Sequence, residues 1–221
     1  MKIILIILLI IIVLITIILY FLKNNVPIPS LIKNSSKTET TQNSIKTLCF
    51  LGSGGHTAEM IELLKSLQIS NYTPRTYLIG EGDSLSLSKI IDFENETQVE
   101  YSKYKLYTIP RARQVGQSWI TTPFSTFKTL VSCFSILIYE KPEYIFGNGP
   151  GSCVPLFLLA KFISTIHPKS RLKLVYIESF ARVNTLSLSG KILYYFTDLF
   201  IVQWPNLLKK YPKAKYNGVL V

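Results

Sequence analysis

The segment TLCFLGSGGHTAEM, residues 47–60, sets the expectation for the fold of this chain. Five apolar or small residues run directly into a glycine-rich stretch at residues 52–55, His56 closes that stretch, and a helix-like pattern follows. A glycine-rich turn between a strand and a helix lets another group approach the backbone closely. The free N–H groups and partial positive charge at a helix amino terminus suit a phosphate.

The turn departs from the two commonest phosphate motifs. Thr57 stands where the dinucleotide fingerprint G-x-G-x-x-G has its last glycine, and a P-loop would need a lysine that is absent here. A plain tight turn with a histidine at the helix start is therefore the alternative. If the turn binds a phosphate, His56 could touch it or accept a proton. The candidate phosphate-binding residues of this turn are Gly52, Ser53, Gly54, Gly55 and Thr57.

The same strand–loop–helix order repeats along the rest of the chain. Apolar runs predict strands at residues 47–51, 75–80, 105–110, 143–148, 172–179 and 199–203. Helical patterns occupy residues 59–67, 126–139, 153–163, 190–198 and 206–211. This alternation predicts an α/β fold: a Rossmann-like parallel sheet with helices on both faces. Ligands of such sheets bind at the carboxyl ends of the strands.

Two further loops follow predicted strands and carry residues that suit phosphates. The turn at residues 147–152 offers Asn148, Gly149 and Gly151, and together with the first turn it could hold a diphosphate. Arg111 and Arg113 follow the third strand, and arginine binds phosphate in a bidentate manner. Simple turn geometry and a solvated surface loop are the respective alternatives.

Glu178 ends the predicted strand at residues 172–179, and a carboxylate at the end of a buried strand has to be paired or used. It could cap the next helix, or it could orient or deprotonate a sugar hydroxyl. Both alternatives stay open on the sequence. Arg182, four residues later, is a further candidate for diphosphate binding.

The amino-terminal stretch predicts a membrane anchor. Residues 3–22 are uncharged and almost wholly aliphatic, which is long enough for one transmembrane helix, and a cleaved signal peptide is the alternative. One lysine, Lys2, precedes the stretch, and Lys23, Lys33 and Lys37 follow it, so we expect the domain to face the cytosol. Residues 23–46 are expected to be a flexible linker, and residues 47–221 the globular domain.

Composition narrows the function classes. The 221 residues carry a formal net charge of +11, which favours phosphorylated ligands or an acidic membrane surface. The basic residues are scattered, so no nucleic acid is expected. The sequence has neither a D-x-D motif nor a His/Cys/Asp cluster, and we therefore expect no metal and no cofactor. Cys49, Cys133 and Cys153 are widely spaced and are predicted to be buried thiols.

Five motifs in order resemble a known family. They are GSGGHTAEM, IPRARQVGQSW, FGNGPGSCVPL, KYPKAKY and the stretch YIESFARVNTLSLSGKILYYFTDLFIVQWP. The chain from residue 47 onward resembles the membrane-anchor subunits of the UDP-N-acetylglucosamine transferase of asparagine-linked glycosylation. The loops are also similar to the acceptor half of bacterial lipid-intermediate glycosyltransferases of the GT-B type.

The resemblance implies a function on the cytosolic face of the endoplasmic reticulum membrane. With a soluble catalytic glycosyltransferase subunit, which supplies the donor-binding half, the family adds a second N-acetylglucosamine to dolichyl-diphosphate N-acetylglucosamine. It implies an inverting β1,4 transfer without metal, and no activity without the partner. The enzyme of the first N-acetylglucosamine-phosphate step is a further candidate partner. His56 and Glu178 are the candidate catalytic residues.

The carboxyl-terminal residues are the candidate docking site for that partner. They are uncharged and β-prone, and they comprise Gly218, Val219, Leu220 and Val221. Two other functions remain as alternatives. One is a membrane-tethered dinucleotide-dependent enzyme, in which Glu81 after the second strand would bind a ribose. The other is a scaffold whose loops perform no chemistry.

Overall fold

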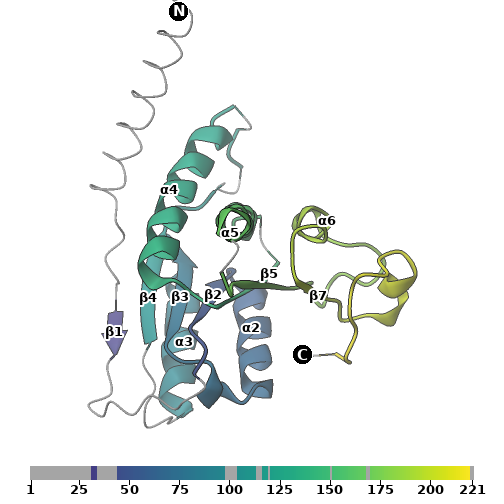
Figure 1. Ribbon diagram of the computed structural model, residues 1–221, viewed down its shortest axis with the longest axis horizontal. Coiled ribbons are helices and arrows are strands. Elements are labelled where there is room, and N and C mark those ends of the chain that lie inside the picture. Colours follow the sequence, from purple (N-terminus) through teal and green to yellow (C-terminus); the bar gives the residue numbers. More distant parts are fainter. Residues whose placement is uncertain are drawn as a thin grey trace, which may run out of the picture.

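Figure 1 shows the computed structural model of the chain. It describes residues 31–33, 44–97, 104–112, 116–118, 120–149, 151–167 and 170–219. The expected membrane segment 3–22 and most of the expected linker 23–46 lie outside these ranges. Among the residues that are described, none of the helices combines the length and the apolarity needed to cross a membrane.

The described chain forms one seven-stranded sheet in the order β1-β4-β3-β2-β5-β6-β7. The pairs from β4 through to β7 are parallel, and β1 joins the edge strand β4 antiparallel. The strands are β1 (Leu31–Lys33), β2 (Thr47–Leu51), β3 (Arg75–Gly80), β4 (Tyr104–Ile109), β5 (Tyr144–Asn148), β6 (Lys173–Ile177) and β7 (Leu199–Ile201). The predicted α/β fold with a parallel sheet is confirmed, and all six predicted strands are present.

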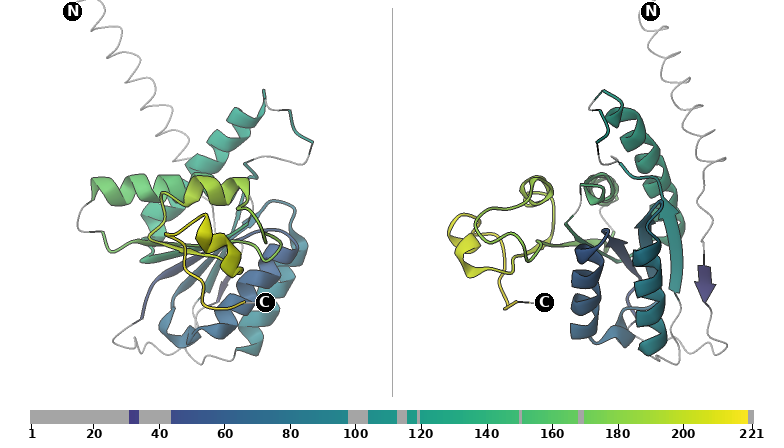
Figure 2. Two further views of the ribbon diagram at one scale, coloured as in Figure 1. Left: turned by 90° about the vertical axis from the view of Figure 1, so that its right-hand side faces the viewer. Right: turned by 180° about the vertical axis from the view of Figure 1, so that it is seen from behind.

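Helices cover both faces of this sheet, as Figure 2 shows. The first helices, α2 (Gly55–Ser66) and α3 (Ser84–Glu96), pack together on one face. The other face carries α4 (Thr122–Glu140), α5 (Cys153–Ile166) and the short α6 (Leu188–Leu193). Two 3₁₀ turns, η1 (Ile69–Asn71) and η2 (Pro205–Lys209), complete the described elements.

The central strand β2 explains why its sequence is apolar without alternation. Leu48 and Phe50 belong to the core under α4 and α5, whereas Cys49 and Leu51 belong to the core under α2. A parallel strand covered on both faces has no solvent side, so each residue is buried. The predicted burial of the three cysteines is confirmed, and all three are free thiols.

The strand order places a topological switch point at β2 and β5. From β2 the chain continues through β3 and β4 on one side of the sheet, and then crosses to β5, β6 and β7 on the other side. The connections after β2 and β5 therefore diverge, and a crevice opens between them at the carboxyl ends of the strands. These two connections are the glycine-rich turns that the sequence singled out.

Helix α3 and strand β1 are absent from the sequence prediction, and the helix predicted at residues 206–211 is replaced by the 3₁₀ turn η2. The segment SLSLSKIIDFENE forms α3, which the sequence analysis missed because its first residues alternate as in a strand. The carboxylate of Asp83 accepts a hydrogen bond from the Ser86 backbone N–H, and Ile90 and Phe93 bury one face of the helix. Strand β1 lies within the stretch expected to be a flexible linker.

Candidate functional site

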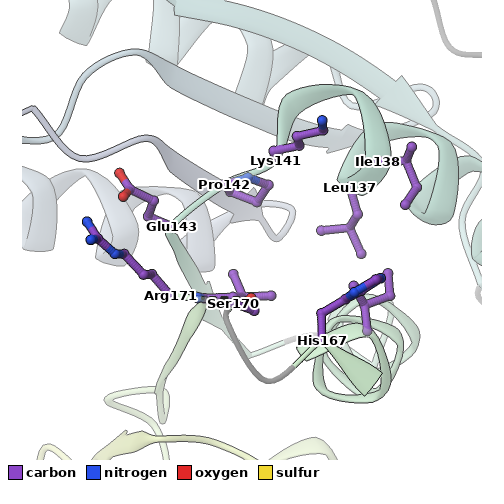
Figure 3. Close-up of a pocket in the computed structure, with 10 residues that line it drawn as sticks. Leu137, Ile138, Lys141, Pro142, Glu143, His167, Ser170 and Arg171 are labelled. Atoms are coloured by element: carbon purple, nitrogen blue, oxygen red, sulfur yellow. Dashed lines mark hydrogen bonds between the residues drawn. The ribbon is translucent and has the colours of Figure 1, made fainter. Parts of the chain in front are cut away.

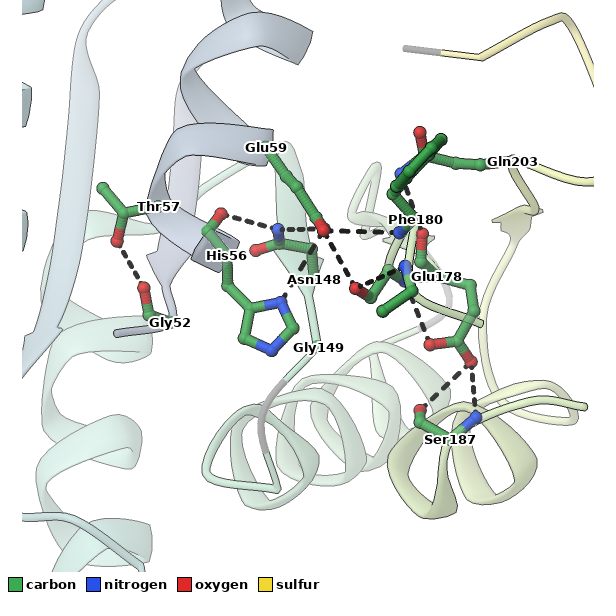
Figure 4. Close-up of polar contacts among 12 residues, drawn as sticks. Gly52, His56, Thr57, Glu59, Asn148, Gly149, Glu178, Phe180, Ser187 and Gln203 are labelled. Atoms are coloured by element: carbon green, nitrogen blue, oxygen red, sulfur yellow. Dashed lines mark hydrogen bonds and ion pairs between the residues drawn. The ribbon is translucent and has the colours of Figure 1, made fainter. Parts of the chain in front are cut away.

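The two glycine-rich turns meet at the switch point, where His56 lies against Gly149 (Figure 4). Gly149 has a φ of 73°, a backbone conformation that favours glycine. A Cβ built at Gly149 would overlap the imidazole of His56. The close approach of the two turns therefore requires glycine at this position. By contrast, a Cβ at Gly54, Gly55 or Gly151 would meet open space, which leaves room for a ligand.

A cleft of about 620 Å³ opens beside these turns. Its polar end contains Gly52, Ser53, Arg111 and Gly151, four of the residues that the sequence selected for a diphosphate. Asp83 also lines the cleft. Its other walls are more apolar, and they include Val154, Pro155, Leu188 and Ile192 of helices α5 and α6. The cleft thus combines anion-binding groups with an apolar surface.

A second cavity, of about 320 Å³, lies at the opposite edge of the sheet (Figure 3). Lys141 and Glu143 precede β5, and Leu172 precedes β6, so this cavity borders the amino ends of the strands. Ligands of parallel sheets bind at the carboxyl ends instead. The cleft beside the glycine turns is therefore the candidate site.

His56 is the second residue of α2, and its position is fixed from two sides. The side-chain amide of Asn148 donates a hydrogen bond to the His56 main-chain oxygen at 2.7 Å. The ring packs on Gly149 and its side chain keeps 31% exposure. The buried Nδ1 atom has no hydrogen-bond partner among the described residues, and it lies 3.7 Å from Oε2 of Glu59.

Glu59 is a site residue that the sequence analysis missed. It lies one helical turn after His56, with a side chain only 13% exposed. Ser179 Oγ and the Phe180 backbone N–H donate hydrogen bonds to Oε1 at 2.9 and 3.3 Å, and Asn148 Nδ2 donates to Oε2 at 3.3 Å. Burial opposes ionisation, but the nearby His56 ring and the hydrogen bonds from Ser179 and Asn148 outweigh it and lower the pKa of Glu59. The i, i+3 spacing from His56 is the signal that could have identified it.

Glu178 is fully buried at the end of β6 and is held by three donors. Its oxygens accept hydrogen bonds from the backbone N–H of Ser179 at 3.0 Å, from that of Ser187 at 2.9 Å and from the Ser187 hydroxyl at 3.0 Å. Ser187 in turn caps α6 through the Gly190 N–H. These contacts favour the structural alternative for Glu178, because the carboxylate is fully buried and both of its oxygens already accept hydrogen bonds from the protein.

Three other candidates for diphosphate binding, Thr57, Arg111 and Arg182, differ in their position relative to the cleft. Thr57 is buried, and its hydroxyl contacts the Gly52 carbonyl and the Ser86 hydroxyl, so it holds the turn from inside. Arg111 lines the cleft and donates from Nε to the Glu81 carbonyl at 3.0 Å. Arg182 is exposed after β6 and does not line the cleft.

Three of the sequence candidates cannot be placed in the site. Arg113, Leu220 and Val221 lie outside the described residues. The described ranges contain no group of three or more His, Cys, Asp or Glu side chains that could hold a metal.

Comparisons with known proteins show the family to which the chain is related. A family model described as "Oligosaccharide biosynthesis protein Alg14 like" matches residues 47–220. The chain is 44% identical over 188 residues to the UDP-N-acetylglucosamine transferase subunit ALG14 of Mus musculus, which covers 82% of this chain and 86% of that protein. It is 45% identical over 192 residues to the subunit alg14 of Schizosaccharomyces pombe, with coverage of 84% and 87%. The family resemblance inferred from the five motifs is confirmed.

The fold is also similar to that of MurG from Acinetobacter baumannii, with a TM-score of 0.52 and 16% sequence identity. The similarity covers 73% of this chain and 42% of MurG, so the chain spans less than half the length of that protein. At this level of identity the likeness concerns the fold alone.

Proposed function

The chain belongs to the Alg14-like family of oligosaccharide biosynthesis proteins, and from this premise we propose that it is the acceptor-binding, membrane-anchoring subunit of a heteromeric UDP-N-acetylglucosamine transferase. The observation that carries the proposal is the meeting of two glycine turns at the switch point, beside a cleft with a polar end and apolar walls. Such a cleft suits a lipid-linked diphosphate. The acceptor that we propose is dolichyl-diphosphate N-acetylglucosamine.

The diphosphate would bind at the amino terminus of α2. The first turn of that helix presents N–H groups that have no helical partner, and its partial positive charge attracts an anion. The open space over Gly54 and Gly55 allows a phosphate to reach these groups. Arg111 at the polar end of the cleft supplies a full positive charge. The apolar residues of α5 and α6 would face the lipid.

In the transfer step we propose, His56 accepts the proton of the acceptor sugar hydroxyl. As that O–H bond breaks, the oxygen attacks the anomeric carbon of the donor sugar. The bond from this carbon to the diphosphate of UDP breaks, and its electron pair leaves with UDP. A single displacement of this kind inverts the anomeric centre and gives the β1,4 linkage. Glu178 takes no part in the step.

The donor nucleotide would bind to a soluble catalytic partner. The fold similarity to MurG covers 42% of that protein, which supports a role as one part of a larger glycosyltransferase. We place the complex at the cytosolic face of the endoplasmic reticulum membrane, with residues 3–22 as the anchor. The apolar length of that stretch and the lysines that follow it support this placement.

The proposal is tested with membranes that contain the full chain, the catalytic partner, or both. With dolichyl-diphosphate N-acetylglucosamine and radiolabelled UDP-N-acetylglucosamine, a lipid-linked disaccharide should form only when both proteins are present. Product from the partner without this chain would contradict an acceptor-binding role.

A His56→Ala variant separates catalysis from a pure scaffold. If His56 is the general base, its replacement should lower transfer by about 10²- to 10⁴-fold. Recovery of the partner on membranes should stay unchanged, because the proposed docking site is the tail at residues 218–221 and does not include His56. Near-normal turnover by the folded and partnered variant would favour the scaffold alternative.

A further inference from the structure

The contacts of Glu59 tie together three segments that are far apart in sequence. Asn148 lies 89 positions away, at the end of β5, and Ser179 lies 120 positions away, after β6. Both donate to the same carboxylate, which α2 carries on the face of His56 (Figure 4). The Glu59 carboxylate therefore links the segments that follow three strands at the switch point. These links hold the residues of the candidate site in a fixed geometry.

The acceptor sites of this carboxylate are nearly all used. A carboxylate offers about four lone-pair sites, two on each oxygen. Ser179 Oγ and the Phe180 N–H occupy both sites of Oε1, and Asn148 occupies one site of Oε2. One site of Oε2 remains, and this oxygen lies 3.7 Å from Nδ1 of His56.

His56 Nδ1 is the complementary group. It is buried, and within the described chain it has no hydrogen-bond partner. A buried N–H without a partner costs about 1–3 kcal/mol, so a modest turn of the ring toward Oε2 is favourable. Catalytic hydrogen bonds are often long before the substrate binds and shorten in the complex.

We propose that Glu59 is a positioning residue that accepts Nδ1–H of His56 and thereby leaves Nε2 as the proton-accepting nitrogen. This inference rests on the proposed role of His56 as the base. The hydrogen bond at one ring nitrogen decides which tautomer is present, and it sets the orientation of the ring. Gly149 supports the same orientation, because the ring packs on its backbone. Glu59 thus acts through His56 and does not touch the reacting atoms.

The first experiment compares Glu59→Gln in the wild-type and His56→Ala backgrounds, using the membrane-bound complex with its partner. A glutamine oxygen can still accept from Ser179 and Phe180, but its amide would face the donors on Asn148 and His56. We expect kcat to fall about 10²-fold or more, because the ring loses the carboxylate that orients it, with the acceptor KM nearly unchanged. In the His56→Ala background the same substitution should have almost no further effect, because the two residues act as a unit.

The pH dependence of kcat provides a second test, because a purely structural role of Glu59 would leave it unchanged. Among the described residues, Glu59 is the ionisable group whose side chain forms an ion-pair contact with the His56 ring. The proposed hydrogen bond joins the Glu59 carboxylate to the ring, so the acid limb of the kcat profile should shift in Glu59→Gln. Ser179→Ala is the matched control, since it removes one donor from Oε1 without changing the carboxylate beside His56. That control should leave the acid limb in place.

A chemical probe tests the inference without any transfer assay. The chain has two histidines, so His167→Asn leaves His56 as the single target of diethyl pyrocarbonate. Adding Glu59→Gln should change the rate of His56 modification several-fold, because the carboxylate no longer holds Nδ1 of the ring. An unchanged rate, or equal losses of kcat in the two His56 backgrounds, would overturn the inference. A changed rate in a chain that supports no transfer would instead refute the proposed function and leave the contact standing.

Discussion

At the scale of single residues, Glu59 and Glu178 are two carboxylates at the same edge of the sheet with different surroundings. Glu59 receives its donors from two distant segments, the end of β5 and the loop after β6, and keeps one acceptor site toward His56. Glu178 accepts from the residue that follows it and from Ser187, and it is fully buried. The first arrangement can orient the ring of His56, whereas the second holds the loop that leads into α6.

A Glu178→Gln substitution should therefore destabilise the protein. One amide oxygen cannot satisfy three donors, and its NH₂ group would face at least one of them, so we expect a loss of about 1–3 kcal/mol in the free energy of unfolding. Urea unfolding of the full chain in detergent measures it. A variant as stable as the wild type would contradict the structural role.

The pKa of Glu178 determines how that loss of stability depends on pH. Burial raises the pKa of Glu178 above its ordinary value of 4.5, although hydrogen bonds from Ser187 and Ser179 and the charge of Arg182 oppose the rise. The folded protein then binds this proton more tightly than the unfolded chain does. Its contribution to stability therefore declines as pH rises from about 4.5 through the raised folded pKa. The stability advantage of the wild type over Glu178→Gln should shrink across the same window.

The sequence predicted His56 and the glycine turns because these are local signals, a strand, a turn and a helix within fourteen residues of chain. It could not assign Glu59, whose partners Asn148 and Ser179 come from distant strand ends. Likewise the sequence left two tasks open for Glu178. The choice depends on Ser187, which reaches the carboxylate only after the chain has turned back after β6.

At the scale of elements, the turn after β5 is as important as the helix that carries His56. Gly149→Ala would place a Cβ inside the imidazole and would strain a backbone with a φ of 73°. We expect transfer to fall at least tenfold, because His56 must move, together with a loss of about 1–2 kcal/mol in stability. Gly82→Ala is the control, since Gly82 has a φ of 76° but a Cβ there meets open space. If both variants lose the same activity, general strain explains the effect and contact with His56 does not.

Helix α4 divides into two halves with different surroundings. Its second half supplies Cys133, Ile136 and Leu137 to the core. Its first turns extend beyond the sheet (Figure 1), and they expose Phe124 at 74% next to Ile120 at 83%. Exposed apolar side chains on a basic protein suit a membrane surface.

We therefore expect the first turns of α4 to contact the bilayer. A chain that starts at Ser44 should bind anionic liposomes at low salt. Replacing both Ile120 and Phe124 by serine should weaken that binding about tenfold or more, since each buried apolar side chain contributes about 1.5–3 kcal/mol. Leu85→Ser is the control, because Leu85 is 71% exposed on α3, on the other face of the sheet. Equal loss in the control, or binding unchanged by the double substitution, would contradict the contact.

At the scale of the whole molecule, alternation of strands and helices was enough to predict a parallel sheet covered on both faces. Alternation does not determine the strand order, which depends on the side to which each connection crosses. That order puts β2 beside β5 and so brings together two turns that lie about ninety residues apart. The carboxyl-end rule selected the candidate loops, and the strand order then decided that the turns after β2 and β5 meet.

The carboxyl-terminal tail, residues 218–221, is the expected docking site for the partner. Lys215 pairs with β7, with its N–H donating to the Phe200 carbonyl at 2.8 Å, and the chain then leaves the sheet edge at Gly218 with Val219 45% exposed. The three consecutive apolar residues 219–221 contribute little stabilisation while their side chains are exposed to water. Buried in an interface, each would contribute about 1.5–3 kcal/mol before ordering costs. Even half of that sum corresponds to roughly 10- to 10³-fold in affinity.

Deleting residues 219–221 should therefore release the soluble partner from membranes and abolish transfer. The tie between Lys215 and β7 remains in the truncated chain, so it should stay folded and membrane-bound, which protease resistance and membrane flotation would measure. Replacing the same three residues by serine separates their apolar character from the length of the tail, and it should release the partner equally well. Unchanged recovery of the partner with either variant would place the docking surface elsewhere on the domain.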